Sequence, residues 1–185
     1  MRALAELRYH VFVEELGRHY QPQHVVLRQL LDDIDRDSIN FAFFVNNTLV
    51  GGVRITPLMR QMKYDPHFAE RYGVGNDSRR APRGVYASRL VLLRTFRRRK
   101  ELAFFLFRVY EHLLARGVRC IYLNTCARLV RLYMRFGFRP TGQTFFLHEA
   151  SERVIPMAAE LDMAFLGRVT SRLFHDYAGT LSRRG

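Results

Sequence analysis

Residues 88–103 read SRLVLLRTFRRRKELA, an apolar, strand-like run that passes through a cluster of cations into a helical pattern. The cations of this stretch are Arg94, Arg97, Arg98, Arg99 and Lys100. Free backbone N–H groups and the helix dipole both favour an anion at the start of a helix. The stretch therefore indicates a phosphate site where a strand gives way to a helix. A nucleic-acid-binding face and an ordinary solvated surface are the two alternatives.

Length and composition describe one globular domain over residues 1–185. The hydrophobic fraction of 48% and the charged fraction of 25% are typical of a folded protein. No apolar run approaches the roughly 20 residues of a membrane span, and the N-terminal residues lack the apolar core of a signal peptide. We therefore expect a cytoplasmic protein. The net charge of +13 favours a polyanionic partner: nucleic acid, acidic lipid or an acidic protein.

The cysteines and histidines give no sign of metal or redox chemistry. Cys120 lies in an apolar run and Cys126 just beyond it, as expected of buried thiols in a reducing compartment. The seven histidines show no metal-ligand spacing. We expect neither a metal nor a tightly bound cofactor.

Hydrophobic periodicity predicts alternating strands and helices. Helices are expected over residues 2–16, 101–116, 127–136 and 163–177. Strands are expected over residues 41–45, 49–55, 85–93, 118–124, 144–148 and 154–161. Residues 18–40 read as polar and irregular, and residues 57–83 as a long excursion with a short helix near 66–72. Strand–helix–strand units beside a hairpin predict an α/β fold of three layers, a central mixed, twisted sheet with helices on both faces.

On these residues the chain resembles the GNAT acyltransferase superfamily over nearly its whole length. Phe96-Arg97 stands at the aromatic–Arg position of the superfamily's glycine-rich loop, but Arg98, Lys100 and Leu102 replace its glycines. The segment LYMRFGF, ending at Phe138, resembles the superfamily's Tyr-x-x-x-Gly-Phe. The resemblance implies acyl transfer from a thioester to an amine.

A narrower resemblance is to the acyl-homoserine-lactone synthases and the related N-acyl amino acid synthases. RYHVFVEELG, which begins at Arg8, is similar to their Arg-x-x-Val-Phe start. Asp32 and Asp35 fit their acidic pair, while VGGVRI and SRL place Arg54 and Arg89 on their arginine strands.

Two departures favour simple N-acylation over lactone formation. Lactone synthases usually carry a glutamate, proposed to act in general base catalysis, where this chain has Val85-Tyr86-Ala87, and a tryptophan that this chain lacks. The chain also opens on its first helix, where relatives have a strand. The resemblance thus implies an enzyme that moves a fatty acyl group to an amino acid or similar amine. A lactone synthase producing a quorum-sensing signal is the alternative.

The resemblance also implies roles for individual residues. Tyr133 is expected to protonate the leaving thiolate, although it also fits a core aromatic of a helix. The resemblance implies that Asp32 and Asp35 bind the acceptor's ammonium or order a water, whereas their residue types by themselves favour an exposed acidic turn or helix cap. The expected acceptor-binding ion-pair network is Arg8, Arg54 and Arg89. The expected donor site comprises Leu90, Val91, Leu92, Arg97, Arg98, Arg99, Lys100, Glu101 and Leu102.

The cations that stand in place of glycines indicate which thioester donor the protein uses. Glycines let a pyrophosphate approach the backbone closely, and their absence weakens a coenzyme A cradle. Acyl carrier protein offers one phosphate on an acidic surface, so we expect it as the donor in preference to acyl-CoA. A basic nucleic-acid-binding module and an acyltransferase scaffold without catalysis are the rival interpretations.

Overall fold

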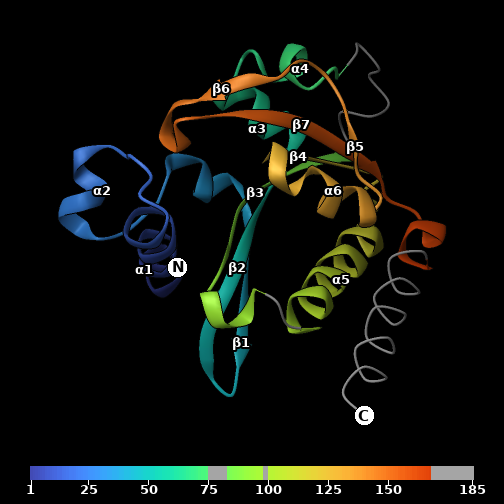
Figure 1. Ribbon diagram of the computed structural model, residues 1–185. Coiled ribbons are helices and arrows are strands. Elements are labelled where there is room, and N and C mark those ends of the chain that lie inside the picture. The colour runs from blue at the N-terminus through green and yellow to red at the C-terminus, as the bar shows by residue number, and fades with distance from the viewer. Residues whose placement is uncertain (75–82, 98–99, 168–185) are drawn as a thin grey trace.

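The computed structural model describes residues 1–74, 83–97 and 100–167, of which residues 100 and 101 are described by their backbone alone. Its strands form one mixed sheet in the order β1-β2-β3-β4-β7-β5, with β6 paired to β7 (Figure 1). The strands are β1 Ile39–Val45, β2 Thr48–Pro57, β3 Gly84–Leu92, β4 Cys120–Cys126, β5 Arg139–Pro140, β6 Phe145–Leu147 and β7 Glu152–Glu160. Only β3 and β4 pair in parallel, as a crossover through a helix requires.

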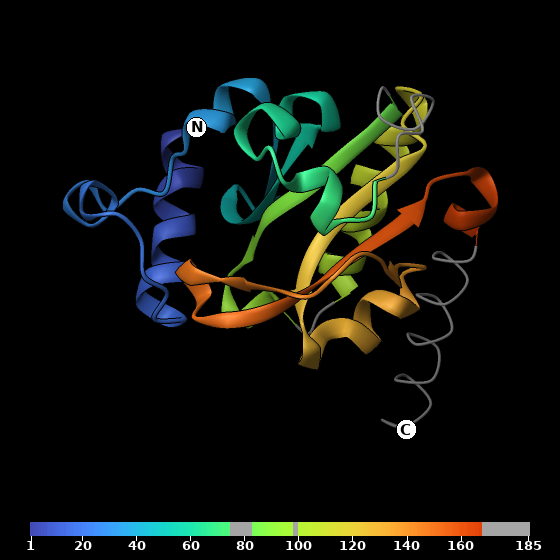
Figure 2. The same ribbon diagram turned by 90° about the horizontal axis from the view of Figure 1, so that it is seen from above.

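Helices cover both faces of this sheet. The helical elements are α1 Arg2–Tyr9, η1 His10–Glu15, α2 Pro22–Leu27, η2 Asp33–Asp37, α3 Leu58–Tyr64, α4 Phe68–Arg71, η4 Arg94–Phe96, α5 Lys100–Ala115, α6 Ala127–Arg135 and η5 His148–Ala150. Successive β4 side chains point to opposite faces. Ile121 and Leu123 belong to the core under α5 and α6, whereas Cys120 and Tyr122 pack with α3 and α4. The predicted three-layer α/β fold is confirmed (Figures 1 and 2).

The predicted strands and long helices are present, with small shifts at their ends. Asn46 and Asn47 both have positive φ, which is the backbone geometry of a tight hairpin turn between β1 and β2. The first helix continues to Glu15, but its second half is π-helical. The last predicted helix begins at residue 163, and its residues 168–177 lie outside the described part of the chain.

Two short helices lie in segments that we expected to be irregular. Helix α2 begins with Pro22 in its first turn and buries none of its residues, so no apolar stripe marks it. Helix α3 buries Leu58 and Gln61 within two turns, too few to show a helical period. The short helix expected near residues 66–72 is α4. No described helix has both the length and the apolar character needed to cross a bilayer.

Strands β3 and β4 separate along their length, which opens the middle of the sheet. They pair only from Gly84 to Tyr86 on β3 and from Cys120 to Tyr122 on β4. Beyond that point β3 stays paired with β2, and β4 stays paired with β7. Figure 2 shows the green β3 and the yellow β4 side by side at one end and apart at the other. The divergence leaves one edge of β3 without a described strand partner.

Gly52 lets α1 and the sheet approach closely. A Cβ at Gly52 would lie 2.6 Å from the Phe41 carbonyl oxygen and 2.6 Å from Leu4 Cδ1. We predict that Gly52→Ala lowers the free energy of unfolding by about 1–3 kcal/mol, because the backbone oxygen must move. The measurement is urea denaturation followed by circular dichroism.

Gly167→Ala is the matched control, since a Cβ there meets no atom within 4 Å. It should leave stability unchanged or raise it slightly. Equal stability of the two variants would contradict the close approach at Gly52.

Candidate active site

A chain of buried ion pairs joins α1, η2, β2 and β3. At its inner end the Arg8 guanidinium is fully buried and donates from Nη1 to Asp35 Oδ1 at 2.9 Å. Its Nη2 donates to Asn40 Oδ1 at 2.6 Å. A guanidinium taken out of water needs such partners, because an unpaired buried charge costs several kcal/mol. Arg8 therefore anchors α1 to the acidic segment before β1.

Arg54 of β2 connects both aspartates. Its Nη1 donates to Asp32 Oδ2 at 2.6 Å and to Asp35 Oδ2 at 3.3 Å, while its Nε donates to Ser88 Oγ at 3.0 Å. Arg54 interrupts an otherwise apolar strand, where an unpaired charge would be costly. These partners remove that cost.

Arg89 reaches the same aspartate through a β-bulge. Between the pairs Gly52–Val91 and Arg54–Ser88, one residue of β2 faces two of β3. Arg89 lies in this bulge with a φ of 54°, a left-handed conformation that is rare for a residue with a side chain. Its Nε donates to Asp32 Oδ2 at 3.0 Å, and its Nη1 to the Tyr20 hydroxyl at 2.5 Å.

The two aspartates also cap the helical turn η2. The side chain of Asp32 accepts from the backbone of Asp35, and Asp35 Oδ2 accepts from the Asp32 N–H at 2.8 Å. The acidic pair thus forms the helix cap that one interpretation of the sequence predicted, and it is also an ion-pair partner.

Electrostatics keep Asp32 ionised. Burial alone would raise the pKa of Asp32, but Arg89 and Arg54 outweigh it and hold the pKa below its usual value. Burial lowers the pKa of Arg8, against the opposing effect of Asp35. Three guanidiniums face two carboxylates, so the cluster of Arg8, Asp32, Asp35, Arg54 and Arg89 carries one excess positive charge. We call it the ion cluster.

The ion cluster is sealed at one end and accessible at the other. The Arg8 side chain is 0% exposed, whereas the Asp32 and Arg89 side chains are 22% and 16% exposed. The guanidinium of Arg89 lies 4.9 Å from the centre of the Tyr20 ring. A small molecule can therefore reach Asp32 and Arg89, at the part of β3 that has left β4.

The turn η5 closes the site from the other side. Its Glu149 bears on Arg89 electrostatically, and its backbone oxygen accepts from the His19 N–H at 3.0 Å. Arg18 and Glu152 add an ion pair at 3.7 Å. These contacts hold the β6–β7 hairpin against the segment after η1.

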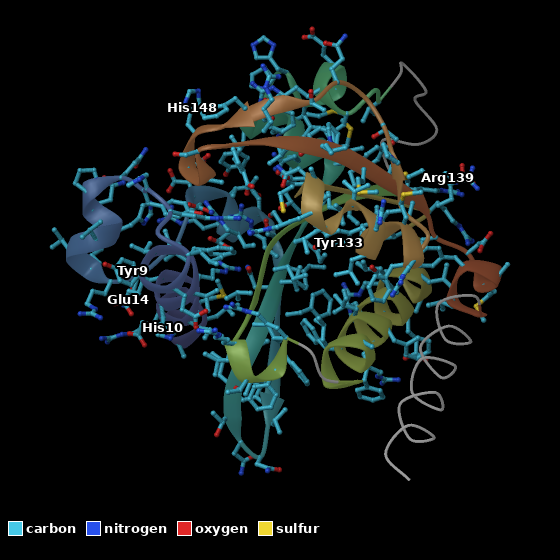
Figure 3. All side chains as sticks on the ribbon, viewed as in Figure 1. Tyr9, His10, Glu14, Tyr133, Arg139 and His148 are labelled. Carbon is cyan, nitrogen blue, oxygen red and sulfur yellow. The ribbon has the colours of Figure 1, made fainter. Side chains whose placement is uncertain are left out.

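On the other face of the sheet, Tyr133 of α6 lies near the end of β4. Its ring is half-buried against the core and packs edge-on to Phe138 at 5.7 Å. Burial, with a smaller contribution from the neighbouring Cys126 thiol, raises the pKa of Tyr133 to about 12. Figure 3 shows Tyr133 on the side of α6 toward the middle of the molecule.

Cys120 and Cys126 are both buried free thiols, as the sequence predicts.

The expected donor residues are described only in part. Leu90, Val91 and Leu92 lie on the freed length of β3, as expected of a strand that offers backbone N–H groups. Arg97 donates from Nε to the Leu92 carbonyl at 2.9 Å and forms an ion pair with Glu15 of η1. Arg98 and Arg99 lie outside the described residues, as do the side chains of Lys100 and Glu101, and Leu102 packs against the core.

A separate groove lies between α1, η1 and α2. It has a volume of about 450 Å³ and is lined by Glu6, Tyr9, His10, Glu14, Leu27 and Arg28. Figure 3 marks Tyr9, His10 and Glu14 on this side of the molecule. Glu14 pairs with both His10 and Arg28, so the groove's charges are largely satisfied within the protein.

Sequence reasoning missed several polar partners in the site. Tyr20 and Asn40 come from segments without a regular pattern, and nothing in the sequence separates them from surface residues. Glu15 lies in the helix predicted over residues 2–16, and the helical period gives no sign of its ion pair with Arg97. Tyr86 was noted only as the replacement of a glutamate, although its place in an alternating strand puts it on the same face as Ser88 and Arg54.

The comparisons with known proteins agree with this architecture. Residues 3–160 match the family of N-acyl amino acid synthase FeeM. A search among curated proteins found no match.

Three similar solved structures include two acyl-homoserine lactone synthases. The CoA-dependent acyl-homoserine lactone synthase BjaI, solved with SAM and isopentyl-CoA, is 18% identical with a TM-score of 0.71, covering 91% of this chain and 79% of its own. The CoA-dependent synthase MesI is 15% identical with a TM-score of 0.68, covering 91% and 85%. Escherichia coli ElaA is 23% identical with a TM-score of 0.60, covering 85% and 88%. At these identities the likeness concerns the fold.

We predict that the buried ion pairs of the ion cluster contribute more to stability than an exposed ion pair. Asp35→Asn leaves the fully buried Arg8 without its anionic partner, so we expect the free energy of unfolding to fall by about 3–5 kcal/mol. Glu6→Gln, which removes an exposed pair with Arg2, should cost less than about 1 kcal/mol. Guanidinium chloride denaturation of both variants measures the difference. Comparable losses would show that the buried pair contributes no more than a surface pair.

Proposed function

The chain belongs to the N-acyl amino acid synthase FeeM family, and we propose that it transfers a fatty acyl group from a carrier thioester to the amine of an amino acid or similar acceptor. The observation that carries the proposal is the accessible end of the ion cluster, a cluster with one more guanidinium than carboxylates, beside the divergence of β3 and β4. Such an end suits a small acceptor with both an ammonium and a carboxylate, because it offers Asp32 to one and guanidiniums to the other.

The acceptor enters from the ion-cluster face and the thioester occupies the divergence of the strands. Backbone N–H groups on the freed edge of β3, near residues 90–92, polarise the thioester carbonyl. The amine nitrogen attacks the carbonyl carbon, the C–N bond forms and the C–S bond breaks. The neutral amine loses one proton in forming the amide and the thiolate gains one, so the products are an amide and a free thiol.

Tyr133 supplies the proton to the departing thiolate. A phenol with a pKa of about 12 stays protonated throughout the physiological pH range, so it is always available as an acid. Asp32 is a weak base because its pKa is lowered, and it serves better to hold the acceptor's ammonium. The acceptor's ammonium first loses one proton to solvent ordered at the accessible end of the cluster, so that a neutral amine attacks. The second proton, which the nitrogen loses as the amide forms, passes through solvent to the Tyr133 phenolate and restores the acid.

Lactone formation is not part of the proposal. Tyr86 stands in the segment where the resemblance expects a glutamate, and burial raises the pKa of Tyr86. A tyrosine that stays protonated does not take over the work of a carboxylate base.

We predict that Tyr133→Phe lowers kcat about 100-fold or more, the usual contribution of a positioned acid. The wild type expressed in cells should produce new N-acyl species, detected by mass spectrometry of lipophilic extracts, and the variant should produce far less. Purified protein gives the rate through release of the free thiol.

Tyr110→Phe is the control, because Tyr110 is a buried tyrosine on the neighbouring α5. It should retain turnover. Unchanged turnover in Tyr133→Phe would remove Tyr133 from the mechanism, and no N-acyl product from the wild type would contradict the proposed function.

For the donor we propose acyl carrier protein in preference to acyl-CoA. The missing glycines support this choice, and so does a stripe of exposed arginines on α6 and just after it. Arg128, Arg131, Arg135 and Arg139 follow one another at intervals of three and four residues. Helix α6 packs on the same core as α5, through Val130 and Tyr133, so the stripe borders the donor face. An acidic carrier would be attracted to it.

With a common acyl chain, we predict a kcat/KM at least tenfold higher for acyl carrier protein than for acyl-CoA, and lower at high salt. Arg131→Glu should raise KM for the carrier and leave the value for acyl-CoA unchanged. Lys63→Glu, on α3 across the sheet, is the control for a change of net charge. Equal or better efficiency with acyl-CoA would overturn the preference.

A further inference from the structure

A directed chain of hydrogen bonds runs from β4 to β3 on the ion-cluster face. The Asn124 side chain hydrogen-bonds to the Tyr72 hydroxyl and lowers the pKa of Tyr72 against the larger effect of burial. Tyr72 donates to the Tyr86 hydroxyl at 3.1 Å. Because the Tyr86 oxygen receives a hydrogen from Tyr72, the hydroxyl hydrogen of Tyr86 is left to point onward.

The rings of Tyr72 and Tyr86 are buried and tightly packed. Tyr72 is 2% exposed and Tyr86 9% exposed. Phe68 stacks on Tyr72 at 4.1 Å and meets Tyr86 edge-on at 5.2 Å. Tyr86 is also the last residue of β3 that pairs with β4, so its hydroxyl is fixed at the base of the divergence. Burial raises the pKa of both tyrosines, which keeps the hydroxyls protonated as donors.

The groups near the Tyr86 hydroxyl are mainly hydrogen-bond donors. Arg54 and Arg89 lie close enough to Tyr86 to lower its pKa against the effect of burial. Nη2 of Arg54 makes no hydrogen bond to any residue within 1–74, 83–97 and 100–167. The carboxylate of Asp65 bears on Tyr86 more weakly and is bound by Arg71 at 3.1 Å.

We propose that the Tyr86 hydroxyl, oriented by Tyr72 and Asn124, binds the carboxylate of the acceptor together with Arg54 and Arg89. The inference rests on the proposed function and adds a specificity-determining residue to it. The Tyr86 hydroxyl, whose oxygen already accepts from Tyr72, and two guanidiniums offer mainly hydrogens. They fit an anion with two acceptor oxygens and discriminate against a carboxamide, whose NH₂ would meet donors. The acceptor's carboxylate then faces the excess positive charge of the ion cluster.

Binding of a product pair tests this directly. Calorimetry compares N-dodecanoylglycine with N-dodecanoylglycinamide on the full-length wild type and on Tyr86→Phe, which keeps the ring and removes the hydroxyl. The wild type should bind the acid at least about tenfold more tightly, and the variant should lose about tenfold in affinity for the acid alone. Tyr72→Phe should cause a smaller loss, because it frees the Tyr86 hydroxyl to rotate without removing it.

Tyr110→Phe again serves as the control, since it removes a buried hydroxyl from the opposite face, and circular dichroism verifies that each variant is folded. A wild type with no preference for the acid, or a preference that survives in Tyr86→Phe, would overturn the proposal. A different result would contradict the proposed function alone: the wild type prefers the acid but forms no amide from a thioester and glycine.

Discussion

Two aspartates hold together the segments on which the site depends. Asp32 and Asp35 bind arginines from α1, β2 and β3 while they cap the turn η2, so four distant stretches of chain meet in one network. Burying such a network is costly unless its charges are largely paired, which fixes its geometry closely. Arg89 even adopts a left-handed backbone to take part. The network has one more guanidinium than carboxylates, so in the proposed function stability and acceptor binding use the same residues.

In the proposed mechanism, the divergence of β3 and β4 sets where the chemistry takes place. It separates the proposed acceptor face, built from the ion cluster and the tyrosines, from the proposed donor face with α5 and α6. Tyr133 approaches from the donor face and Tyr86 from the acceptor face, so the two hydroxyls lie on opposite sides of the proposed reaction centre. Both are protonated before the reaction, because their pKa values are raised. In the proposed mechanism Tyr133 gives its proton to the thiolate, whereas Tyr86 only donates a hydrogen bond.

Most of the fold could be predicted from the sequence, because long apolar periods such as those of α5 and β3 reflect burial directly. The short helices α2 and α3 could not, since two turns do not establish a period. The motif resemblance predicted that Arg8, Arg54 and Arg89 form an ion-pair network, and the structure shows them paired with the aspartates. The bulge at Arg89 and the bond between Tyr72 and Tyr86 depend on register and on long-range packing, and neither leaves a trace in local sequence.

The ion pair between Arg97 and Glu15 connects the two proposed substrate sites. Glu15 ends the helical segment that begins with α1, and α1 carries Arg8 into the ion cluster. An anion bound at Arg97 would compete with Glu15 for the guanidinium. If that competition changed the affinity for the acceptor, thermodynamic linkage would require acceptor binding to change the affinity for the anion by the same factor. One helical segment thus contributes a residue to each of the two proposed sites.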